Sequence, residues 1–478
     1  MAVDLRSEML IAGEWTRGSK SADVLSPFTG EPIGTAPCAT TGDVERALAA
    51  AVEGSRKMRG LAAHQRTAIL TRAADLADDR VEEIAETITL EAGKLITEAR
   101  GEASRAGAIL RVSAYEGARA GGETLQLDSS IGAEGKFGFT IRQPCGVVVA
   151  ITPFNYPVLL LLHKLAPALA AGNSVVLKPA QQTPFSALLL ASILLEAGLP
   201  PMALQVLTGS GSSIGAALCS DERVRKVSFT GSTAVGEAIT RTAGVKRLSL
   251  ELGSSCPTLV LDDADIDAAA DAIATGGYVN AGQVCISVQR VLVQRSCHGD
   301  LLDALVPRVE ALRTGDPLSD QTTIGTLINR AEASRVAAAI ADASERGARV
   351  LTGGECDGSI VQPAIVDDVK PTDPLSRDEL FGPAVAVTAV DDVDQAIRFA
   401  NDSDYGLGAG IFTNNLGAAM RFVQGVDAGA LHVNWTPLWR ADPMPYGGLK
   451  ASGYGKEGPR YAVEEMTDVK TVVFHGLG

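Results

Sequence analysis

Three side chains are of the types that act together in covalent chemistry on a carbonyl group. Cys285 lies in the stretch VNAGQVCISVQR, Glu251 ends the apolar run RLSLE, and Asn155 stands in TPFNYP. A thiolate attacks carbonyl carbons, a carboxylate draws a proton from water, and an amide N–H stabilises a developing oxyanion. Each also has a structural alternative: a buried apolar cysteine, a partnered glutamate, and an asparagine that caps the helix expected from Pro157.

The positions of the asparagine and the glutamate follow from a series of predicted strands. From Gly146 onward, the apolar runs GVVVAI, SVVLKP, ALQVLT, KVSFTG and RLSLEL alternate with helices expected from Pro157, from Pro184, near Gly215 and from Ser232. Strands that are apolar throughout and are separated by helices indicate a parallel sheet with both faces covered. The sequence therefore predicts a doubly wound α/β lobe.

Further elements surround this lobe. Residues 43–120 show helical spacing, and Asp43 is predicted to cap the first helix. A second α/β series is expected over residues 257–433, with strands at PTLVLD, RVLVQ, AVAVTAV and GALHV, so a cleft should separate two lobes. GGETLQLDSSIGAEGKFGFTIRQPCG and the tail EEMTDVKTVVFHG alternate like strands outside both lobes. Because such segments often pair with another subunit, we expect a homo-oligomer.

Composition excludes several classes of function. The chain has 478 residues, of which 46% are hydrophobic and 21% charged, and a formal net charge of -15. These values are typical of a globular protein of two or three domains, and the negative charge argues against nucleic-acid or membrane binding. Seven scattered cysteines and five histidines predict neither a disulfide framework nor a metal site. The first residues lack a secretory signal, so a cytoplasmic protein is expected.

Glycine-rich turns in the first lobe suit a nucleotide. GSGSSIG, residues 209–215, departs from a dinucleotide fingerprint at Ile214, and GSTAVG, residues 231–236, lacks the lysine of a P-loop. Each alone is more readily explained as a strand-to-helix turn. FTGS, however, follows a predicted strand and opens a helix whose free N–H groups suit a pyrophosphate. Lys178, at the end of SVVLK, can reach a ribose hydroxyl from the carboxyl edge of the sheet.

Taken together, these stretches resemble the aldehyde dehydrogenase superfamily. The resemblance continues through HKLAPALAAGNSVVLKPAQQTP, FTGSTAVG, ELFGP and MPYGGLKASGYGKEG, in the family's order over residues 10–474. It implies an α/β fold with two open α/β domains and a β-hairpin arm that builds homodimers or homotetramers. The implied parts are a dinucleotide-binding domain (1–122 and 143–252), a catalytic domain (253–433), an oligomerisation arm (123–142 and 462–478), and a connecting segment that lines the substrate entrance (434–461).

The resemblance also implies a reaction, the oxidation of an aldehyde to a carboxylic acid with reduction of NAD or NADP. Cys285 would form a hemithioacetal, Asn155 and the Cys285 backbone N–H would hold its oxyanion, and hydride loss would leave a thioester. Glu251 would activate the water that hydrolyses it. Lys164 matches a lysine tied to proton release, with a helix-surface lysine as the alternative. The implied cofactor contacts are Thr152, Lys178, Gln181, Gly211, Gly215, Phe229, Gly231, Ser232, Leu252, Glu379 and Phe381.

Two departures from the family's pattern bear on the cofactor. Ser254 replaces a glycine of the usual ELGG and puts a side chain where the family lets the backbone approach the nicotinamide. Gln181 stands where NAD-preferring members often have glutamate. Because a neutral amide cannot repel a 2′-phosphate, we expect both NAD and NADP to serve.

The predicted substrate is a short aldehyde. Arg440 and Trp435 in NWTPLWRADPMPYGG lie near what the resemblance implies is the aldehyde entrance, and a guanidinium suits an acidic tail. YGKEGPRYAVEEMT resembles members of the family that act on semialdehydes, lactaldehyde, and phospho- or phosphonoaldehydes, so the resemblance implies these candidates. The alternative for Arg440 is a structural or solvated charge. Val284, where members that bind phosphate often have arginine, favours a less charged substrate.

Two other functions stay open at this point. A CoA-acylating aldehyde dehydrogenase would yield acyl-CoA and would tolerate the loss of Glu251, which such relatives typically lack. A nucleotide-binding protein without turnover would keep the fold alone. The presence of Cys285, Glu251 and Asn155 together argues against it.

Overall fold

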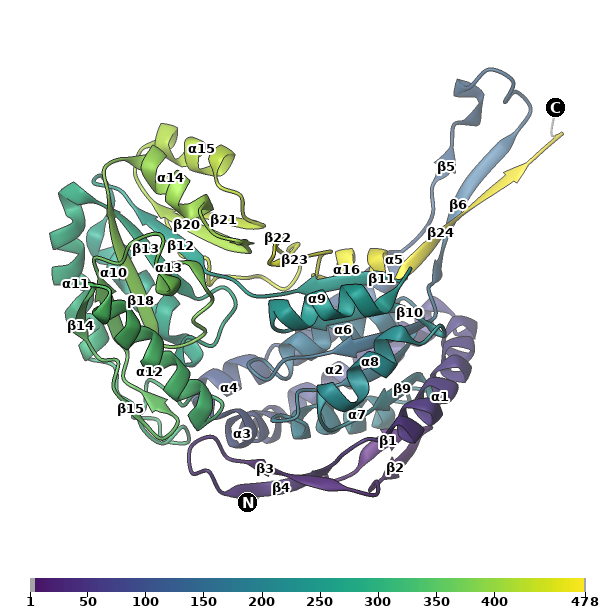
Figure 1. Ribbon diagram of the computed structural model, residues 1–478. Coiled ribbons are helices and arrows are strands. Elements are labelled where there is room, and N and C mark those ends of the chain that lie inside the picture. Colours follow the sequence, from purple (N-terminus) through teal and green to yellow (C-terminus); the bar gives the residue numbers. More distant parts are fainter. Residues whose placement is uncertain (1–4, 477–478) are drawn as a thin grey trace.

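The computed structural model describes residues 5–476, which form two α/β lobes and an arm that projects from one of them (Figure 1). The first lobe is built on a sheet of eight strands within the described residues, in the order β2-β1-β9-β8-β7-β10-β11-β23. These strands are β1 (Met9–Ile11), β2 (Glu14–Thr16), β7 (Val147–Ile151), β8 (Ser174–Lys178), β9 (Leu204–Val206), β10 (Val224–Thr230), β11 (Arg247–Glu251) and β23 (Gly453–Tyr454).

The centre of this sheet is parallel, which confirms the predicted doubly wound lobe. Strands β9, β8, β7, β10 and β11 pair in parallel. Each follows the one before it in the chain through a helix: α6 (Leu159–Ala170), α7 (Phe185–Glu196), α8 (Gly211–Ser220) and α9 (Thr233–Ala243). At the edges, β1 pairs with β9 and β23 pairs with β11 antiparallel. The sequence did not indicate these edge strands because two or three residues are too short to show a period.

Successive residues of the central strands pack against different helices. Val148 and Ala150 of β7 belong to the core formed with α2, α3, α5, α6 and α7, whereas Val147 and Val149 belong to the core formed with α1, α8 and α9. Both faces of the sheet are thus covered, which explains why the strands are apolar throughout. The helices before β5 are α1 (Thr41–Gly60), α2 (Ala63–Asp79), α3 (Val81–Ala92), α4 (Ile96–Ala103) and α5 (Ala106–Arg119).

The first helix is capped by Thr40, so the prediction that Asp43 is the cap was wrong. The Thr40 hydroxyl accepts from the Asp43 backbone N–H at 3.2 Å, and the Asp43 carboxylate accepts from the Thr40 backbone N–H at 2.8 Å. Asp43 therefore fills the third helical position of a capping box, where a carboxylate returns a bond to the cap residue.

The second lobe is built on a sheet of seven strands within the described residues, in the order β14-β17-β18-β13-β12-β20-β21. All neighbours are parallel except β14 and β17. Helices α10, α11 and α12 pack on one face and α14 and α15 on the other. The bounds are β12 (Cys256–Val260), β13 (Val288–Gln294), β14 (Arg349–Thr352), β17 (Ala364–Asp367), β18 (Ala384–Val390), β20 (Gly408–Phe412), β21 (Ala430–Val433), α10 (Ile266–Tyr278), α11 (His298–Glu310), α12 (Arg330–Glu345), α14 (Val393–Asn401) and α15 (Leu416–Gly425).

The arm joins two segments that lie far apart in the chain. Strand β24 (Thr467–Phe474) pairs antiparallel with β6 (Phe137–Pro144) along its whole length, and β5 (Thr124–Leu125) pairs with the other side of β6 (Figure 1). Helix α16 (Pro459–Glu465) contacts α5 and α6, so residues 462–465 of the expected arm segment 462–478 are helical. The remaining strands and α-helix are β3 (Ser21–Leu25), β4 (Pro32–Pro37), β15 (Cys356–Asp357), β16 (Ile360–Val361), β19 (Tyr405–Gly406), β22 (Leu449–Lys450) and α13 (Pro374–Arg377), and short 3-10 helices lie at Leu127–Ser129, Pro201–Ala203, Val279–Gly282 and Arg295–Cys297.

Candidate active site

The carboxyl ends of the central strands of the first lobe form the edge at which the predicted residues gather. Strand β7 lies between β8 and β10, so the chain continues in opposite directions from the two sides of β7. Such a reversal opens a crevice outside the carboxyl ends of the strands. Thr152 directly follows β7, Lys178 ends β8, Gly231 follows β10, and Glu251 ends β11.

The loop that carries Cys285 has an unusual backbone. Between α10 and β13, the residues Asn280, Ala281 and Gly282 all have positive φ angles, at 51°, 53° and 72°. A Cβ atom at Gly282 would lie 2.1 Å from the carbonyl oxygen of Gly382, so only glycine fits there. This left-handed turn directs the chain back and places the thiol at the end of the loop.

The side chain of Gln283 holds this loop in place. Its Nε2 donates to the carbonyl oxygens of Asn280 and Thr326, both at 3.1 Å, and its Oε1 accepts from the Ile328 N–H at 2.9 Å. The backbone carbonyl of Gln283 accepts from Asn155 Nδ2 at 2.8 Å. The asparagine and the cysteine loop are therefore fixed to each other.

Asn155 does not cap the helix that follows it. Val158 is the residue before α6, and no side chain caps it. Asn155 is instead buried, with one amide hydrogen on Gln283 and its backbone carbonyl accepting from Asn280 Nδ2 at 3.1 Å. An amide NH₂ has two hydrogens, so a second donor is left for a group in the adjoining cavity.

Cys285 lines a cavity of about 140 Å³ together with Asn155, Tyr446, His163 and two arginines, Arg105 and Arg440. It also borders a much smaller cavity, lined by Ser254, Glu379 and Phe381 among others. The partly exposed thiol thus has the basic cavity on one side and residues predicted to support the nicotinamide on the other. A thiol in this position is accessible to a ligand, which argues against the interpretation as an inert packing residue.

The electrostatics of the thiol oppose its ionisation. Burial raises the pKa of Cys285 to about 12, with smaller contributions from the nearby Cys256, Glu251 and Glu379 and against a hydrogen bond with Tyr446 that lowers it. The Tyr446 hydroxyl oxygen lies 2.8 Å from the Cys285 sulfur. A nucleophilic thiolate at this position therefore depends on groups that stabilise its charge.

Glu251 is buried without a hydrogen-bond partner. Neither of its carboxylate oxygens has a donor within residues 5–476. Burial and the negative charge of Glu457 raise the pKa of Glu251 well above its ordinary value, while Lys164, Arg440 and Lys456 lower it. A carboxylate with a raised pKa and free oxygens can take a proton from water near neutral pH. The absence of a partner among these residues argues against the interpretation of Glu251 as a partnered structural glutamate.

A buried ion network stands next to this carboxylate. Lys164 Nζ lies 2.8 Å from Glu457 Oε1, and both terminal nitrogens of Arg440 lie 3.3 Å from Glu457 Oε2. The side chain of Lys164 is 1% exposed, so the helix-surface alternative is wrong. Glu457 was missed by the sequence reasoning, although it lies in the quoted motif YGKEG, because nothing local links it to Lys164.

The dipeptide Tyr446–Gly447 connects the thiol to the carboxylate. The Tyr446 hydroxyl contacts the Cys285 sulfur, and a Cβ atom at Gly447 would lie 2.8 Å from Glu251 Oε1. The backbones of Tyr446 and Glu457 pair through two hydrogen bonds of 3.1 and 2.7 Å. One loop therefore brings Cys285, Glu251 and the ion network into the same region.

The predicted cofactor residues at β8 and α8 lie close together. Lys178 is buried, which lowers its pKa to about 8, and its Nζ donates to the Pro179 carbonyl. A Cβ at Gly211 would lie 3.5 Å from Lys178 Cε, so the start of α8 faces this lysine. Gln181 is exposed, whereas Gly215 is half-buried within α8 with open space beside it.

The predicted residues at β10 and β11 surround an open helix terminus. Ser232 is the exposed N-cap of α9, and its side chain makes no cap bond, which leaves first-turn N–H groups for a ligand. Gly231 donates to the Glu251 carbonyl at 3.0 Å, and a Cβ there would meet the Phe229 ring at 2.6 Å. Leu252 is buried against α9.

The side chain of Ser254 lies against Cys256. Its hydroxyl lies 2.9 Å from Cys256 Sγ, and its backbone N–H donates to Glu379 Oε1 at 2.9 Å. Burial raises the pKa of Glu379 to about 7. Phe381 has a φ of 52° and packs edge-on against Phe154 with 6.0 Å between ring centroids. The edge therefore fits a dinucleotide: it has an open helix terminus, close glycines and a buried amine.

The two predicted substrate residues are placed differently. Arg440 lines the cavity beside Cys285. Trp435 does not line it: its side chain is 46% exposed, and its backbone bridges Ile411 of β20. Leu438 lines the cavity instead.

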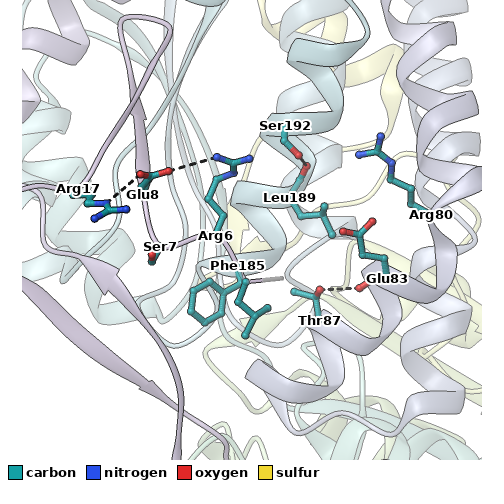
Figure 2. A pocket seen from close by; sticks show the side chains of 11 residues that line it. Arg6, Ser7, Glu8, Arg17, Arg80, Glu83, Thr87, Phe185, Leu189 and Ser192 are labelled. Atoms are coloured by element: carbon teal, nitrogen blue, oxygen red, sulfur yellow. Dashed lines mark hydrogen bonds and ion pairs between the residues drawn. The ribbon is translucent and has the colours of Figure 1, made fainter. Parts of the chain in front are cut away.

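A larger cavity of about 340 Å³ lies where the amino-terminal segment meets α3 and α7 (Figure 2). Its arginines have acidic partners: Arg6 and Arg17 lie 3.6 and 3.3 Å from Glu8, and Arg80 pairs with Glu196. None of the predicted site residues lines it. The cavity beside Cys285 is therefore the better candidate for chemistry.

Within residues 5–476, no group of three His, Cys, Asp or Glu side chains is placed to hold a metal ion. No helix in the same part of the chain combines the length and apolar character needed to cross a membrane.

Comparison with known proteins identifies the family. The model of the aldehyde dehydrogenase family matches residues 15–472. A 3-sulfolactaldehyde dehydrogenase of Priestia megaterium is 45% identical over 98% of both chains, and a lactaldehyde dehydrogenase of Methanococcus aeolicus is 35% identical over 97% of this chain and 99% of its own. The solved NADP complex of an NADP-dependent glyceraldehyde-3-phosphate dehydrogenase from Bacillus halodurans is 36% identical, with a TM-score of 0.96 over 99% of this chain and 100% of that one.

The chain belongs to the aldehyde dehydrogenase family. It is an enzyme that oxidises an aldehyde with NAD or NADP, which confirms the reaction class and the cofactor expected from the sequence.

Proposed function

We propose that this enzyme oxidises a short aldehyde that carries an anionic group and a neighbouring hydroxyl, and that it releases the free carboxylic acid. The observation that carries this proposal is the cavity beside Cys285, which combines a reachable thiol with Arg105, His163 and Arg440. The unpartnered carboxylate of Glu251 supports hydrolysis as the second half of the reaction.

The first half-reaction takes place on the sulfur. The Cys285 thiolate forms a bond to the aldehyde carbon, and the carbonyl oxygen becomes an alkoxide. The free amide hydrogen of Asn155 and the Cys285 backbone N–H are the donors proposed to hold this oxyanion. Lys178 and the open start of α9 at Ser232 would hold NAD or NADP at the carboxyl edge, and the cofactor would supply the acceptor for the hydride that leaves the same carbon. The product on Cys285 is a thioester.

The second half-reaction uses Glu251 as a general base. It takes a proton from a water molecule, the water oxygen bonds to the thioester carbon, and the C–S bond breaks to give the acid and the Cys285 thiolate. The positive charge of Lys164 lowers the pKa of Glu251 and so keeps a larger fraction of it able to accept that proton. This arrangement favours hydrolysis over transfer of the acyl group to coenzyme A.

His163 and Arg440, which line the cavity beside Cys285, are proposed to determine the substrate preference. His163 Nε2 lies 3.4 Å from an oxygen of Asp442, which needs a donor, so the proton of a neutral imidazole is on Nε2. Burial and the charge of Arg440 hold the pKa of His163 down at about 4, so the ring is neutral at pH 7. Its Nδ1 is an acceptor, and neither this atom nor Arg440 Nε has a partner within residues 5–476. These two atoms suit a substrate hydroxyl and an anionic oxygen.

The size and charge of the cavity restrict the substrate further. A volume of about 140 Å³ admits only a short chain. Arg105 is paired with Asp442 and Arg440 with Glu457, so the basic groups are partly neutralised and a singly charged head group fits better than a doubly charged one. Two relatives are named as dehydrogenases of 3-sulfolactaldehyde and of lactaldehyde, and both names agree with a short 2-hydroxyaldehyde as the substrate.

A panel of short aldehydes tests the substrate class. 3-Sulfolactaldehyde, succinic semialdehyde, lactaldehyde and propanal are compared by kcat/KM with each cofactor. We expect Arg440→Met to lower kcat/KM for the anionic aldehydes by about 10-fold to 100-fold, as a charged hydrogen bond would, and to change propanal much less. Arg17→Met, on an 85% exposed side chain, is the matched control. An equal loss for all four aldehydes would contradict an anion-binding role.

A burst experiment tests the hydrolytic step. Glu251→Gln should release one reduced cofactor per active site and then stall, because the thioester forms but is not hydrolysed. Coenzyme A added to the native enzyme should leave the product a free acid. Formation of acyl-CoA, or full turnover by the Glu251→Gln variant, would favour the CoA-acylating alternative. The complete absence of reduced cofactor with any aldehyde would favour a protein that binds nucleotides without turnover.

The preference between the two cofactors rests on the end of β8. Gln181 is exposed there and carries no charge that would repel a 2′-phosphate. We expect both NAD and NADP to support turnover. A preference for NAD above about 1000-fold in kcat/KM, or about 4 kcal/mol, would contradict this.

The arm supports assembly into homodimers or homotetramers. Its strands expose large apolar side chains: Phe137 and Phe474 are 46% and 48% exposed, and Val469 is 55% exposed. Exposed apolar groups gathered on one element are typical of an interaction surface. A monomer mass by light scattering at working concentration would contradict this part of the proposal.

We propose a cytoplasmic location because the cysteines are free. All seven are free, and they are dispersed over both lobes. Free thiols persist in a reducing compartment. Quantitative thiol titration of the protein as isolated from its native cells would reveal oxidised pairs if the compartment were oxidising.

A further inference from the structure

We propose that Tyr446 is a hydrogen-bond donor to the reacting sulfur of Cys285, and that Arg440 strengthens this donor by lying over the phenol ring. The proposal rests on the assignment of Cys285 as the nucleophile and goes beyond it, because it names the group that stabilises the thiolate. Two contacts support it. The Tyr446 oxygen lies 2.8 Å from the Cys285 sulfur, and the Arg440 guanidinium carbon lies 3.9 Å from the centroid of the Tyr446 ring.

The surroundings of the sulfur make such a donor necessary. Cys285 packs against an apolar cluster that contains Cys256, Val284, Ile286 and Leu407. These side chains provide no positive charge, and an uncompensated anion in an apolar site is costly. The Tyr446 hydroxyl belongs to the same cluster and contacts the sulfur directly.

The direction of the hydrogen bond depends on the state of the sulfur. A thiol and a phenol can each donate to the other, so the contact exists when both are protonated. Once Cys285 has lost its proton, only the phenol can donate, and a bond to an ionised acceptor is about twice as strong as a neutral one. Tyr446 stays protonated at neutral pH because burial and the neighbouring Cys285 raise its pKa. The contact therefore favours the thiolate over the thiol.

Tyr446 is held firmly enough for this role. It is 4% exposed, and both its backbone N–H and its backbone carbonyl are hydrogen-bonded to the backbone of Glu457. Arg440, which covers its ring, is itself bound to the Glu457 carboxylate. A cation over the ring face draws electron density from the phenol and makes its O–H a better donor. Glu457 thus orients both Arg440 and Tyr446.

The test measures the ionisation of Cys285 without turnover. The rate of alkylation by iodoacetamide is followed against pH in the full-length enzyme without substrate, in a Cys356→Ser background because Cys356 is exposed. Peptide mapping assigns the labelled site. We expect Tyr446→Phe, which keeps the ring, to slow labelling about tenfold at every pH below the Cys285 pKa, which corresponds to a rise of about one pH unit in the alkylation midpoint.

Two further variants separate the proposed interaction from general damage. Tyr156→Phe removes a hydroxyl that lines the same cavity but has no hydrogen bond to the sulfur, so its alkylation midpoint should not move. Arg440→Met should raise the midpoint in the native background and have little effect in the Tyr446→Phe background. Equal shifts in both backgrounds would mean that Arg440 acts on the sulfur directly.

Turnover provides an independent readout. Tyr446→Phe should lower kcat/KM at pH 7 and shift its acidic limb upward, with the two rates converging at high pH where the thiolate forms without help. An alkylation midpoint that is the same in Tyr446→Phe and the native enzyme would overturn the proposal. It would leave the assignment of Cys285 intact as long as Cys285→Ser abolishes the burst, so the two ideas fail separately.

Discussion

Gly282, in the loop that carries Cys285, offers a sharp test of how the thiol is positioned. We expect Gly282→Ala to lower kcat/KM about 100-fold. The φ of 72° costs alanine about 1 to 2 kcal/mol, and the new Cβ would lie 2.1 Å from the Gly382 oxygen. Since real Cβ contacts essentially never fall below 3.0 Å, the loop or its neighbour must move by about 1 Å. A misplacement of about 1 Å of a catalytic group costs about 100-fold in rate, or about 2.7 kcal/mol.

The assay combines steady-state kinetics with thermal unfolding. The backbone cost alone should lower Tm by about 2 to 4 °C for each kcal/mol, which leaves most of the protein folded at 25 °C. The matched control is Gly101→Ala in α4, where a Cβ has nothing within 4 Å and the backbone is helical. This change should leave kcat/KM as it is and raise Tm slightly. A Gly282→Ala enzyme with more than a third of native kcat/KM would refute the reasoning.

Two other predictions concern buried charges. Lys164→Met leaves the buried Glu457 carboxylate with Arg440 alone, so the free energy of unfolding should fall by about 3 kcal/mol, the lower end for a broken buried pair. Lys164→Met/Glu457→Gln should recover part of that loss in urea unfolding, and a single variant with the native urea midpoint would count against the pair. Lys178, whose pKa is lowered to about 8 by burial, is charged below that pH and neutral above it. The Kd for the cofactor should therefore rise between pH 7 and pH 9, whereas Lys178→Arg, which keeps its charge, should bind with a Kd that is flat over this range.

The sequence was a good guide wherever one residue type decides the local structure. The continuous apolar runs around Val149 and Val176 can only belong to strands covered on both faces, and the parallel sheets were predicted from them. Asn155, Lys178 and Glu251 follow such runs, so their common edge was predictable as well. Asp43 was misassigned because threonine and aspartate both cap helices, and only the coordinates show which one accepts from which N–H.

The partners of the site residues were not predictable in the same way. Tyr446 contacts a sulfur 161 residues away, and Glu457 binds an amine 293 residues away. Hydrogen bonds and ion pairs of this range leave no period in the sequence, and their motif MPYGGLKASGYGKEG contains several other polar side chains. Trp435 was wrongly expected at the substrate site. It is close in the chain to the cavity residues Leu438 and Arg440, but the loop after β21 leaves it exposed to solvent and outside the cavity.

The order of the residues in the chain also has a consequence for biosynthesis. Lys164 leaves the ribosome early, yet its counter-ion lies 293 residues later. At about 5 to 20 residues per second, the growing chain carries this amine for about 15 to 60 s before Glu457 has been made. In the same way, Cys285 is made 161 residues before the tyrosine that contacts its sulfur. The residues proposed to act together therefore meet only when translation is nearly finished, so a nascent chain released before residue 446 would contain Cys285 but neither Tyr446 nor Glu457.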